Sequence, residues 1–518
     1  MIQKTRGAIA AGNSQTAEAG IEMLRLGGNA FDAAVAAVLA SCVTEATLTS
    51  LAGGGFLLAH TQHNENILFD FFTQTPRQKR DVKHVDFCPV GVNFGSVIQE
   101  FHVGLGAIAV PGTAKGLFHI HKRLGRLPLH VIVEPAIHYA KTGVLLGEFQ
   151  SYCFSILQPI LLRTAGSREI FAPGGTLLQS GETFAIPDLA DTLTYMVEEG
   201  IEAFYEGEIA QQLVKDCQEK GGYLTLKDLK EYQVIERKPL KISYRGNTLL
   251  TNPPPSSGGS LIAFTLSLLS QLDLSTVGFG TTEHLKILSN TIRLTNQART
   301  DGYDANLYQP DIAQNFLNPE HISQYADQLT HVANKWGSTT HLSVIDAEGN
   351  AASVTSSNGE GSSYVIPGTG VMTNNMLGEA DLHPIGFHQW QNNARISSMM
   401  SPTMVLKHHQ PEIVLGSGGS NRIRTAILQV ISNVIDFNMS VDDAVNSSRM
   451  HWENDVLSLE PGFHQSDFDK TSFPFTGEVV LWKNHSMFFG GVHTVIQHSD
   501  GTISGGGDRR RNGSVASC

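Results

Sequence analysis

The sequence predicts an α+β protein, since segments with helical patterns and segments with strand patterns are both frequent. Residues 7–60 alternate between the two types, with a strand, two helices and a second strand expected in that order. Residues 180–240 are mainly helical in pattern, whereas strand patterns become more frequent after residue 339. The chain has 518 residues, of which 41% are hydrophobic and 16% are charged, a balance that allows a large buried core.

The first elements are marked by polar capping residues and by glycines. Ser14 is positioned to cap a helix that continues to about Arg25, and the glycine pair at 27–28 ends that helix. Asn29 caps the next expected helix, in which residues 31–39 are apolar on nearly every side. We expect such a helix to be buried on several sides.

Glycine and proline runs mark the later elements. Glycines 53–55 lead into a strand, and because no Gly-Lys-Ser/Thr follows them they predict a structural turn rather than a nucleotide site. Residues 67–72 form another expected strand, and prolines 253–255 end a strand before an apolar helix. Asp500-Gly501 predicts a hairpin turn, and residues 423–435 predict an apolar helix.

The charge distribution excludes some classes of partner. The net charge is −13, and apart from Arg509-Arg510-Arg511 there is no basic run that would favour nucleic acid. We interpret that run as a local salt-bridged or capping cluster. The five cysteines show no metal spacing, and we expect neither a metal nor a cofactor. No apolar N-terminal run or membrane-length segment is present, so we expect a cytoplasmic protein that does not enter a membrane.

Residues 337–358 are the stretch around which the rest of the chain is organised. Residues 340–345 are rich in β-branched side chains, and residues 351–355 are small and compatible with a strand. Between them, Gly349 and Asn350 can take positive φ values. Locally, this pattern is that of an ordinary hairpin.

Two details of this stretch point to chemistry. Small residues crowd the start of the first strand, and serines and threonines are dense in a segment that otherwise looks buried. A threonine hydroxyl is a poor nucleophile without a neighbouring base. After chain cleavage, the threonine's own α-amine, with a reference pKa of about 7.7–8.0, can serve as that base.

The segment 339–346, followed by Gly349-Asn350-Ala351, resembles the processing site of the gamma-glutamyltransferases, which are N-terminal nucleophile hydrolases. The resemblance covers essentially the whole chain. It implies a four-layer αββα sandwich and self-cleavage between Ser338 and Thr339. Residues 1–338 would form a large subunit and residues 339–518 a small one, with Thr339 as both the new N-terminus and the nucleophile.

The same resemblance assigns roles to further residues. Ser357 stands where the family has a threonine that hydrogen-bonds the nucleophile, and it keeps the hydroxyl. Gly418 and Gly419 match the family's oxyanion loop, whose backbone N–H groups stabilise the tetrahedral intermediate. Ser397 and Ser398 match a double-serine motif that binds the α-carboxylate of the gamma-glutamyl group.

Other positions depart from the family pattern. Glu379 falls where the family has its amine-binding aspartate, and Asp381 is a neighbour that could substitute. Either Asn358 or Glu360 is expected to contact substrate. Phe72 replaces the arginine that pairs with the substrate α-carboxylate in well-studied members, a loss worth about 1.5–3 kcal/mol, which is enough to change the preferred acyl group.

Three functions remain open at this stage. The first is a gamma-glutamyltransferase-like enzyme that passes the acyl group of glutathione or a related gamma-glutamyl amide to water or an amine. The second is an amidohydrolase resembling the cephalosporin (glutaryl) acylases, which needs no amine site. The third is an uncleaved, non-catalytic binding or scaffold relative. The sequence does not fix the oligomeric state, and a homo-oligomer is among the alternatives.

Overall fold

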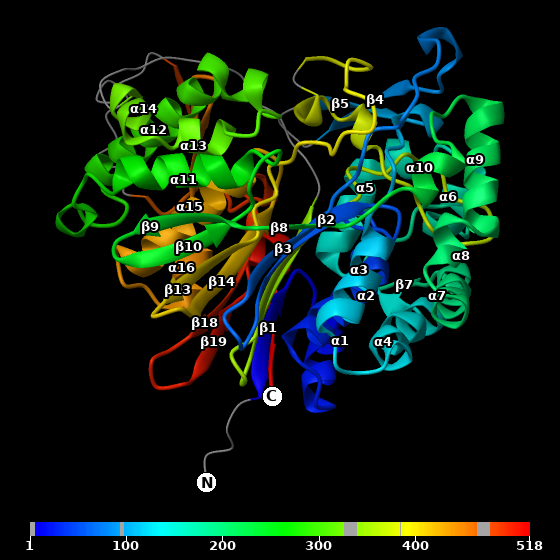
Figure 1. The fold of residues 1–518 in the computed structure, drawn as a ribbon, viewed down its shortest axis with the longest axis horizontal. Helices are drawn as coiled ribbons and strands as arrows, with labels where there is room; N and C mark the ends of the chain where they lie inside the picture. The colour runs from blue at the N-terminus through cyan, green and yellow to red at the C-terminus, as the bar shows by residue number, and fades with distance from the viewer. Residues whose placement is uncertain (1–5, 94–97, 326–338, 384, 464–476) are drawn as a thin grey trace.

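The structure is a computed structural model that describes residues 6–93, 98–325, 339–383, 385–463 and 477–518. Two β-sheets stack face to face at its centre, and helices cover the outer face of each sheet (Figure 1). This arrangement is the four-layer αββα sandwich, which confirms the expected fold class.

The first sheet has seven antiparallel strands in the order β20-β1-β11-β12-β2-β3-β8. Its strands are β1 (Gly7–Ala11), β2 (Gly54–His60), β3 (Asn66–Phe71), β8 (Ile235–Arg237), β11 (Thr340–Asp346), β12 (Ala351–Ser357) and β20 (Ser514–Ser517). The central hairpin of the sequence therefore becomes the middle of this sheet, with every residue of β11 and β12 buried.

The second sheet has six antiparallel strands in the order β19-β18-β14-β13-β10-β9. Its strands are β9 (Leu240–Tyr244), β10 (Asn247–Thr251), β13 (Thr403–Lys407), β14 (Gln410–Gly418), β18 (Gly491–Gln497) and β19 (Ile503–Gly506). Smaller pairings join β4 (Cys88–Asn93) to β5 (Ile98–Val103) and β6 (Val144–Leu145) to β7 (Thr183–Phe184). In a three-stranded sheet, β16 (Val456–Leu459) lies between β15 (Met450–Glu453) and β17 (Glu478–Leu481).

Helices from the first half of the chain cover the seven-stranded sheet (Figure 1). They are α1 (Ser14–Arg25), α2 (Ala30–Thr44), α3 (Thr113–Leu124), α4 (Leu129–Thr142), α5 (Glu148–Leu161), α6 (Ala165–Phe171), α7 (Pro187–Glu199), α8 (Glu202–Tyr205), α9 (Glu208–Lys220) and α10 (Leu226–Lys230). The other outer layer contains α11 (Gly258–Leu269), α12 (Thr282–Ala298), α13 (Ile312–Phe316), α14 (Pro319–Tyr325), α15 (Arg422–Ile435) and α16 (Val441–Asn446). Within the described ranges, no helix combines the length and the apolar character needed to cross a bilayer.

The helix starts agree with the sequence to within one residue. The cap of α1 is Asn13 rather than Ser14, because the Asn13 side chain accepts the N–H of Gln15 at 2.8 Å. Asn29 caps α2 as predicted, in a capping box with Asp32. All residues of α2 are buried, as its apolar composition predicted.

The two sheets approach each other closely where the site is built. The hydroxyl of Ser353 on β12 donates to the carbonyl of Leu415 on β14 at 2.8 Å. The imidazole of His341 on β11 lies against Gly416, where an added Cβ would be 2.3 Å from Cε1 of the ring. Small residues at this interface let β11 and β14 pack so that their ends meet beside Thr339.

Candidate active site

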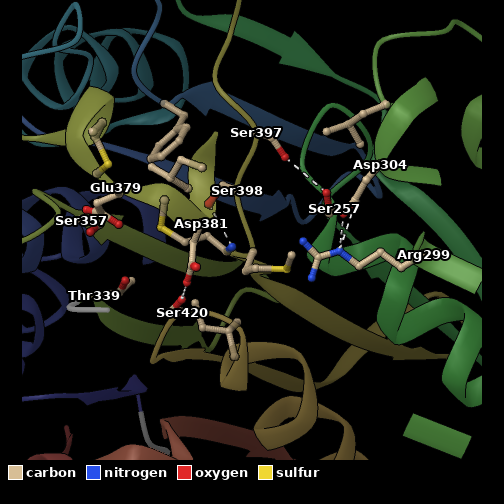
Figure 2. A pocket seen from close by; sticks show the side chains of 17 residues that line it. Ser257, Arg299, Asp304, Thr339, Ser357, Glu379, Asp381, Ser397, Ser398 and Ser420 are labelled. Carbon is tan, nitrogen blue, oxygen red and sulfur yellow. Dashed lines mark hydrogen bonds and ion pairs between the residues drawn. The ribbon is translucent and has the colours of Figure 1, made fainter. Parts of the chain in front are cut away.

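Thr339 lies immediately before β11 and is 5% exposed. It lines a cavity of about 600 Å³, part of it open to solvent (Figure 2). Thr340 pairs with Ser356, and continuing this antiparallel register by one step places Thr339 opposite Ser357. This register accounts for the 18 residues that separate Thr339 from Ser357 in the sequence. Side chains directly opposed in such a pair have Cβ atoms about 4.5–5.5 Å apart. Ser338 lies outside the described residues.

Ser357 is the last residue of β12, and its hydroxyl accepts the N–H of Gly359 at 3.0 Å. The glycine run of the sequence packs behind it, since an added Cβ at Gly53 would be 2.4 Å from the Ser357 carbonyl. The run therefore has the structural role that the sequence predicted.

Gly418 ends β14 directly against the candidate nucleophile. An added Cβ at Gly418 would be 2.0 Å from the Thr339 carbonyl oxygen, a distance that no side chain tolerates. Gly419 has a φ of +124°, which favours glycine. Within the described part of the chain, no hydrogen bond engages the N–H of Gly419 or of Ser420. These N–H groups precede the positive end of α15, so the loop has donors available for an anion.

Two charged residues that sequence reasoning missed form hydrogen bonds with Thr339 or with the residue after it. The Arg511 guanidinium donates to the Thr339 carbonyl at 3.1 Å. Glu45, which is buried, accepts the hydroxyl of Thr340 at 2.6 Å and that of Thr16 at 2.9 Å. Burial raises the pKa of Glu45, although the two hydroxyl donors and Arg511 oppose that effect. These residues are far apart in the sequence, and no motif links them.

The arginine run 509–511 does form a salt-bridged cluster, as the sequence suggested, and this cluster carries Arg511 to the site. Arg510 donates to Glu460 at 2.8 Å and pairs with Asp508 at 3.2 Å. Arg449 pairs with the same Asp508 at 2.7 Å. The network is buried, so its geometry fixes the turn that contains Arg511.

We expect Asp508→Asn to destabilise the protein by about 3–5 kcal/mol at neutral pH, because it leaves the buried Arg449 guanidinium without its carboxylate partner. Burial alone would raise the pKa of Asp508, but Arg449 and Arg510 hold that pKa below its usual range. The ion pairs therefore stabilise the fold above the ordinary aspartate pKa of about 3.9 and lose this effect as the pH falls below it. Thermal unfolding of both chains at pH 7 and pH 3.5 checks this, and an equal difference at both values would contradict it.

Six of the predicted site residues line the cavity together: Thr339, Ser357, Glu379, Asp381, Ser397 and Ser398. Gly418 and Gly419 lie beside Thr339 rather than on the lining. Asn358 is 1% exposed and its amide donates to the Thr373 carbonyl at 3.4 Å, so its side chain is not part of the cavity wall.

One wall of the cavity carries the acidic side chains. Glu379 packs over the turn after β12, where its Oε1 would be 2.1 Å from a Cβ added to Gly359. This oxygen is buried without a hydrogen-bond partner among the described residues. Burial, followed by the nearby Glu360 and Asp381, raises the pKa of Glu379 well above its usual range. Asp381 accepts the Ser420 hydroxyl at 2.6 Å, which ties this wall to the glycine loop (Figure 2).

Phe72 also lines the cavity, where the family pattern has an arginine. Its ring stacks on Phe56 with centroids 5.4 Å apart. The carbonyl of Phe72 accepts the Tyr232 hydroxyl at 2.8 Å and a bond from Arg395. This bond holds Arg395 against the backbone of Phe72, and Arg395 is not among the residues that line the cavity.

The αββα sandwich, with a site built at the start of a central strand, is the architecture of the N-terminal nucleophile hydrolases. A model of the family described as gamma-glutamyltranspeptidase matches residues 16–518. The chain therefore belongs to the gamma-glutamyltranspeptidase family of enzymes.

The known relatives include two kinds of enzyme. The chain is 30% identical to the acylase ACY 1 proenzyme of Pseudomonas sp. (strain V22), with 98% of this chain and 93% of the relative covered. It is 29% identical to the glutathione hydrolase proenzyme of Escherichia coli (strain K12), with 98% and 91% covered. The crystal structure of a cephalosporin acylase from Bacillus halodurans shares the fold with a TM-score of 0.86 at 23% identity, covering 99% of this chain and 96% of that one.

Proposed function

We propose that the chain cleaves itself between Ser338 and Thr339 and then transfers acyl groups through Thr339. The products would be subunits of residues 1–338 and 339–518. The observation that carries this proposal is the placement of Thr339, at the start of a buried central strand, on a cavity wall and opposite a second hydroxyl, that of Ser357. Two relatives are described as proenzymes, which supports a processed chain.

The transfer proceeds in two steps. The freed α-amine of Thr339 accepts the proton of its own hydroxyl, whose oxygen attacks the donor's amide carbonyl. The backbone N–H groups of the loop that contains Gly418 and Gly419 stabilise the tetrahedral oxyanion. The donor's amine then leaves with the proton held by the α-amine of Thr339, which gives an ester on Thr339. Water or a second amine then attacks this ester and regenerates the hydroxyl. The Ser357 hydroxyl orients the nucleophile, and Arg511 fixes its carbonyl.

The acidic wall favours a gamma-glutamyl donor. Glu379 has a buried oxygen without a partner in the described ranges, and two further carboxyl groups lie nearby. Within those ranges, no cluster of His, Cys, Asp and Glu has the geometry to hold a metal ion. An ammonium group is the natural occupant of such a wall, because it supplies both the positive charge and the missing donors. The α-amine of a gamma-glutamyl group fits this description.

A glutaryl-type acylase is the second candidate, because one relative is an acylase and Phe72 removes the family arginine. A glutaryl group has no amine, so the two donors make different demands on Glu379. Gamma-glutamyl and glutaryl anilides, which share one leaving group, separate the candidates when assayed side by side. A higher kcat/KM for the glutaryl anilide would overturn the gamma-glutamyl assignment.

We expect Glu379→Gln to raise KM for a gamma-glutamyl anilide by about 10- to 100-fold, because it removes one charged hydrogen bond. KM for the glutaryl anilide is expected to change little. In the wild type, kcat/KM for the gamma-glutamyl anilide divided by kcat/KM for the glutaryl anilide should increase as the pH rises through the raised pKa of Glu379. Only the ionised carboxylate of Glu379 binds the ammonium group of the donor. Taking the ratio cancels the titration of the Thr339 amine, which affects both donors. A ratio that stays flat over the whole pH range in which the enzyme is active would contradict the role of Glu379.

A further inference from the structure

Arg299 lies on the cavity wall that faces the acidic side chains. It begins the short turn η4 (Arg299–Tyr303), directly after α12. Its Nε donates to the two carboxylate oxygens of Asp304 at 2.9 and 3.1 Å. Figure 2 shows the side chain extending toward the middle of the cavity, with the tip of its guanidinium foremost. Among the residues that line the cavity in the described part of the chain, Arg299 is the one with a positive charge.

Hydroxyl groups complete this wall. The hydroxyls of Ser257 and Ser397 are 3.2 Å apart, and the N–H of Ser257 donates to the carbonyl of Ser398 at 2.8 Å. Ser257 also precedes the first turn of α11, whose positive end therefore lies at the same wall. Figure 2 shows these hydroxyls, with Arg299 and its partner Asp304, on the side of the cavity away from Glu379.

Neighbouring arginines are occupied elsewhere. Arg395 donates to the Phe72 and Gln233 carbonyls and pairs with Asp70 at 3.3 Å. Arg422 is 1% exposed, and its guanidinium lies 4.9 Å from the centre of the Phe488 ring. Neither lines the cavity, so neither can take the place of the arginine that the family pattern has at position 72.

We infer that Arg299, together with Ser257 and Ser397, binds the carboxylate of the donor's acyl group. This inference rests on the proposed acyl transfer through Thr339 and names the group that recognises the donor. Asp304 accepts from Nε of Arg299 and thereby orients the guanidinium. The two Nη atoms make no hydrogen bond to any described residue, so they can bind the two oxygens of the donor's carboxylate. The cation that the family pattern has at position 72, directly after β3, is thereby supplied from the end of α12.

The test compares two anilides with the same leaving group: glutaryl anilide, which has a free carboxylate, and its neutral methyl ester. We expect Arg299→Gln to raise KM for glutaryl anilide by about 10- to 100-fold and to leave kcat/KM for the ester within about twofold. Arg299→Lys keeps the positive charge but not the two parallel N–H donors of the guanidinium, so KM for glutaryl anilide should rise less than in Arg299→Gln. Arg245→Gln is the matched control, since Arg245 also pairs with an aspartate, Asp436, at 3.0 Å and lies outside the cavity lining.

The outcomes separate the inference from the proposed function. The role of Arg299 alone would be overturned if Arg299→Gln still cleaves itself and its kcat/KM falls equally for both donors or falls for neither. A loss confined to the rate with added amine acceptors would assign the residue to the acceptor and would likewise overturn it. A wild-type chain that is neither cleaved nor active on either donor would overturn both.

Discussion

The Thr339→Ala chain is expected to remain a single polypeptide of 56.1 kDa and to lose acyl transfer entirely. Alanine has no hydroxyl to attack the bond after Ser338, so the α-amine that would serve as the base is never released. Removal of a nucleophile costs about 10⁶-fold in kcat where it has been measured in another hydrolase. Gel electrophoresis and anilide hydrolysis, each followed for the wild type and the variant in parallel, measure the two effects.

Thr339→Ser is the control for this variant. Serine keeps the hydroxyl and, after cleavage, the α-amine, so this chain should still process itself and retain part of its activity. Cleavage of the Thr339→Ala chain at the same bond would show that another group attacks it, and the account of Thr339 would then be wrong.

Gly418→Ala is expected to have the second largest effect. The added methyl group would lie 2.0 Å from the Thr339 carbonyl oxygen, so either the end of β14 or the start of β11 must move. Movement of β11 displaces the nucleophile, and movement of β14 displaces the N–H donors for the oxyanion. Loss of one such donor costs about 10²- to 10³-fold in kcat in other enzymes, so we expect a loss of at least this size in both self-cleavage and turnover.

Gly147→Ala is the matched control for the glycine substitution. Gly147 has a φ of −77°, which alanine adopts freely, and an added Cβ there meets nothing within 4 Å. This chain should cleave and turn over at the wild-type rate. Normal activity of Gly418→Ala would show that the contact with Thr339 does not position the nucleophile.

Local patterns in the sequence were sufficient for the elements that carry the nucleophile. The β-branched run and the turn at Gly349 predict the hairpin, and Gly349 has a φ of +90° as expected. Asn350 contributes differently, since its amide donates to Asp346 at 2.8 Å. The antiparallel register then explains why Thr339 and Ser357, which are 18 residues apart in the sequence, face one another.

The residues that sequence reasoning missed are brought to the site by packing between distant elements. Glu45 follows α2, Arg511 follows β19, and Arg299 follows α12, so no local spacing connects any of them with Thr339. Each acts through a side chain whose direction depends on the stacking of the four layers. For the same reason, the sequence shows Phe72 where the resemblance to the family predicts an arginine, but it could not indicate a cation elsewhere on the cavity wall.

The most direct test of self-cleavage before Thr339 is the mass of the purified wild-type chain after incubation at neutral pH, with the N-terminal residue of each fragment determined. We expect two fragments, 1–338 and 339–518, the smaller beginning with Thr339 and gaining the mass of one acyl group when quenched during turnover of an anilide donor. A chain that stays intact, or a fragment that begins at any other residue, would contradict self-cleavage before Thr339.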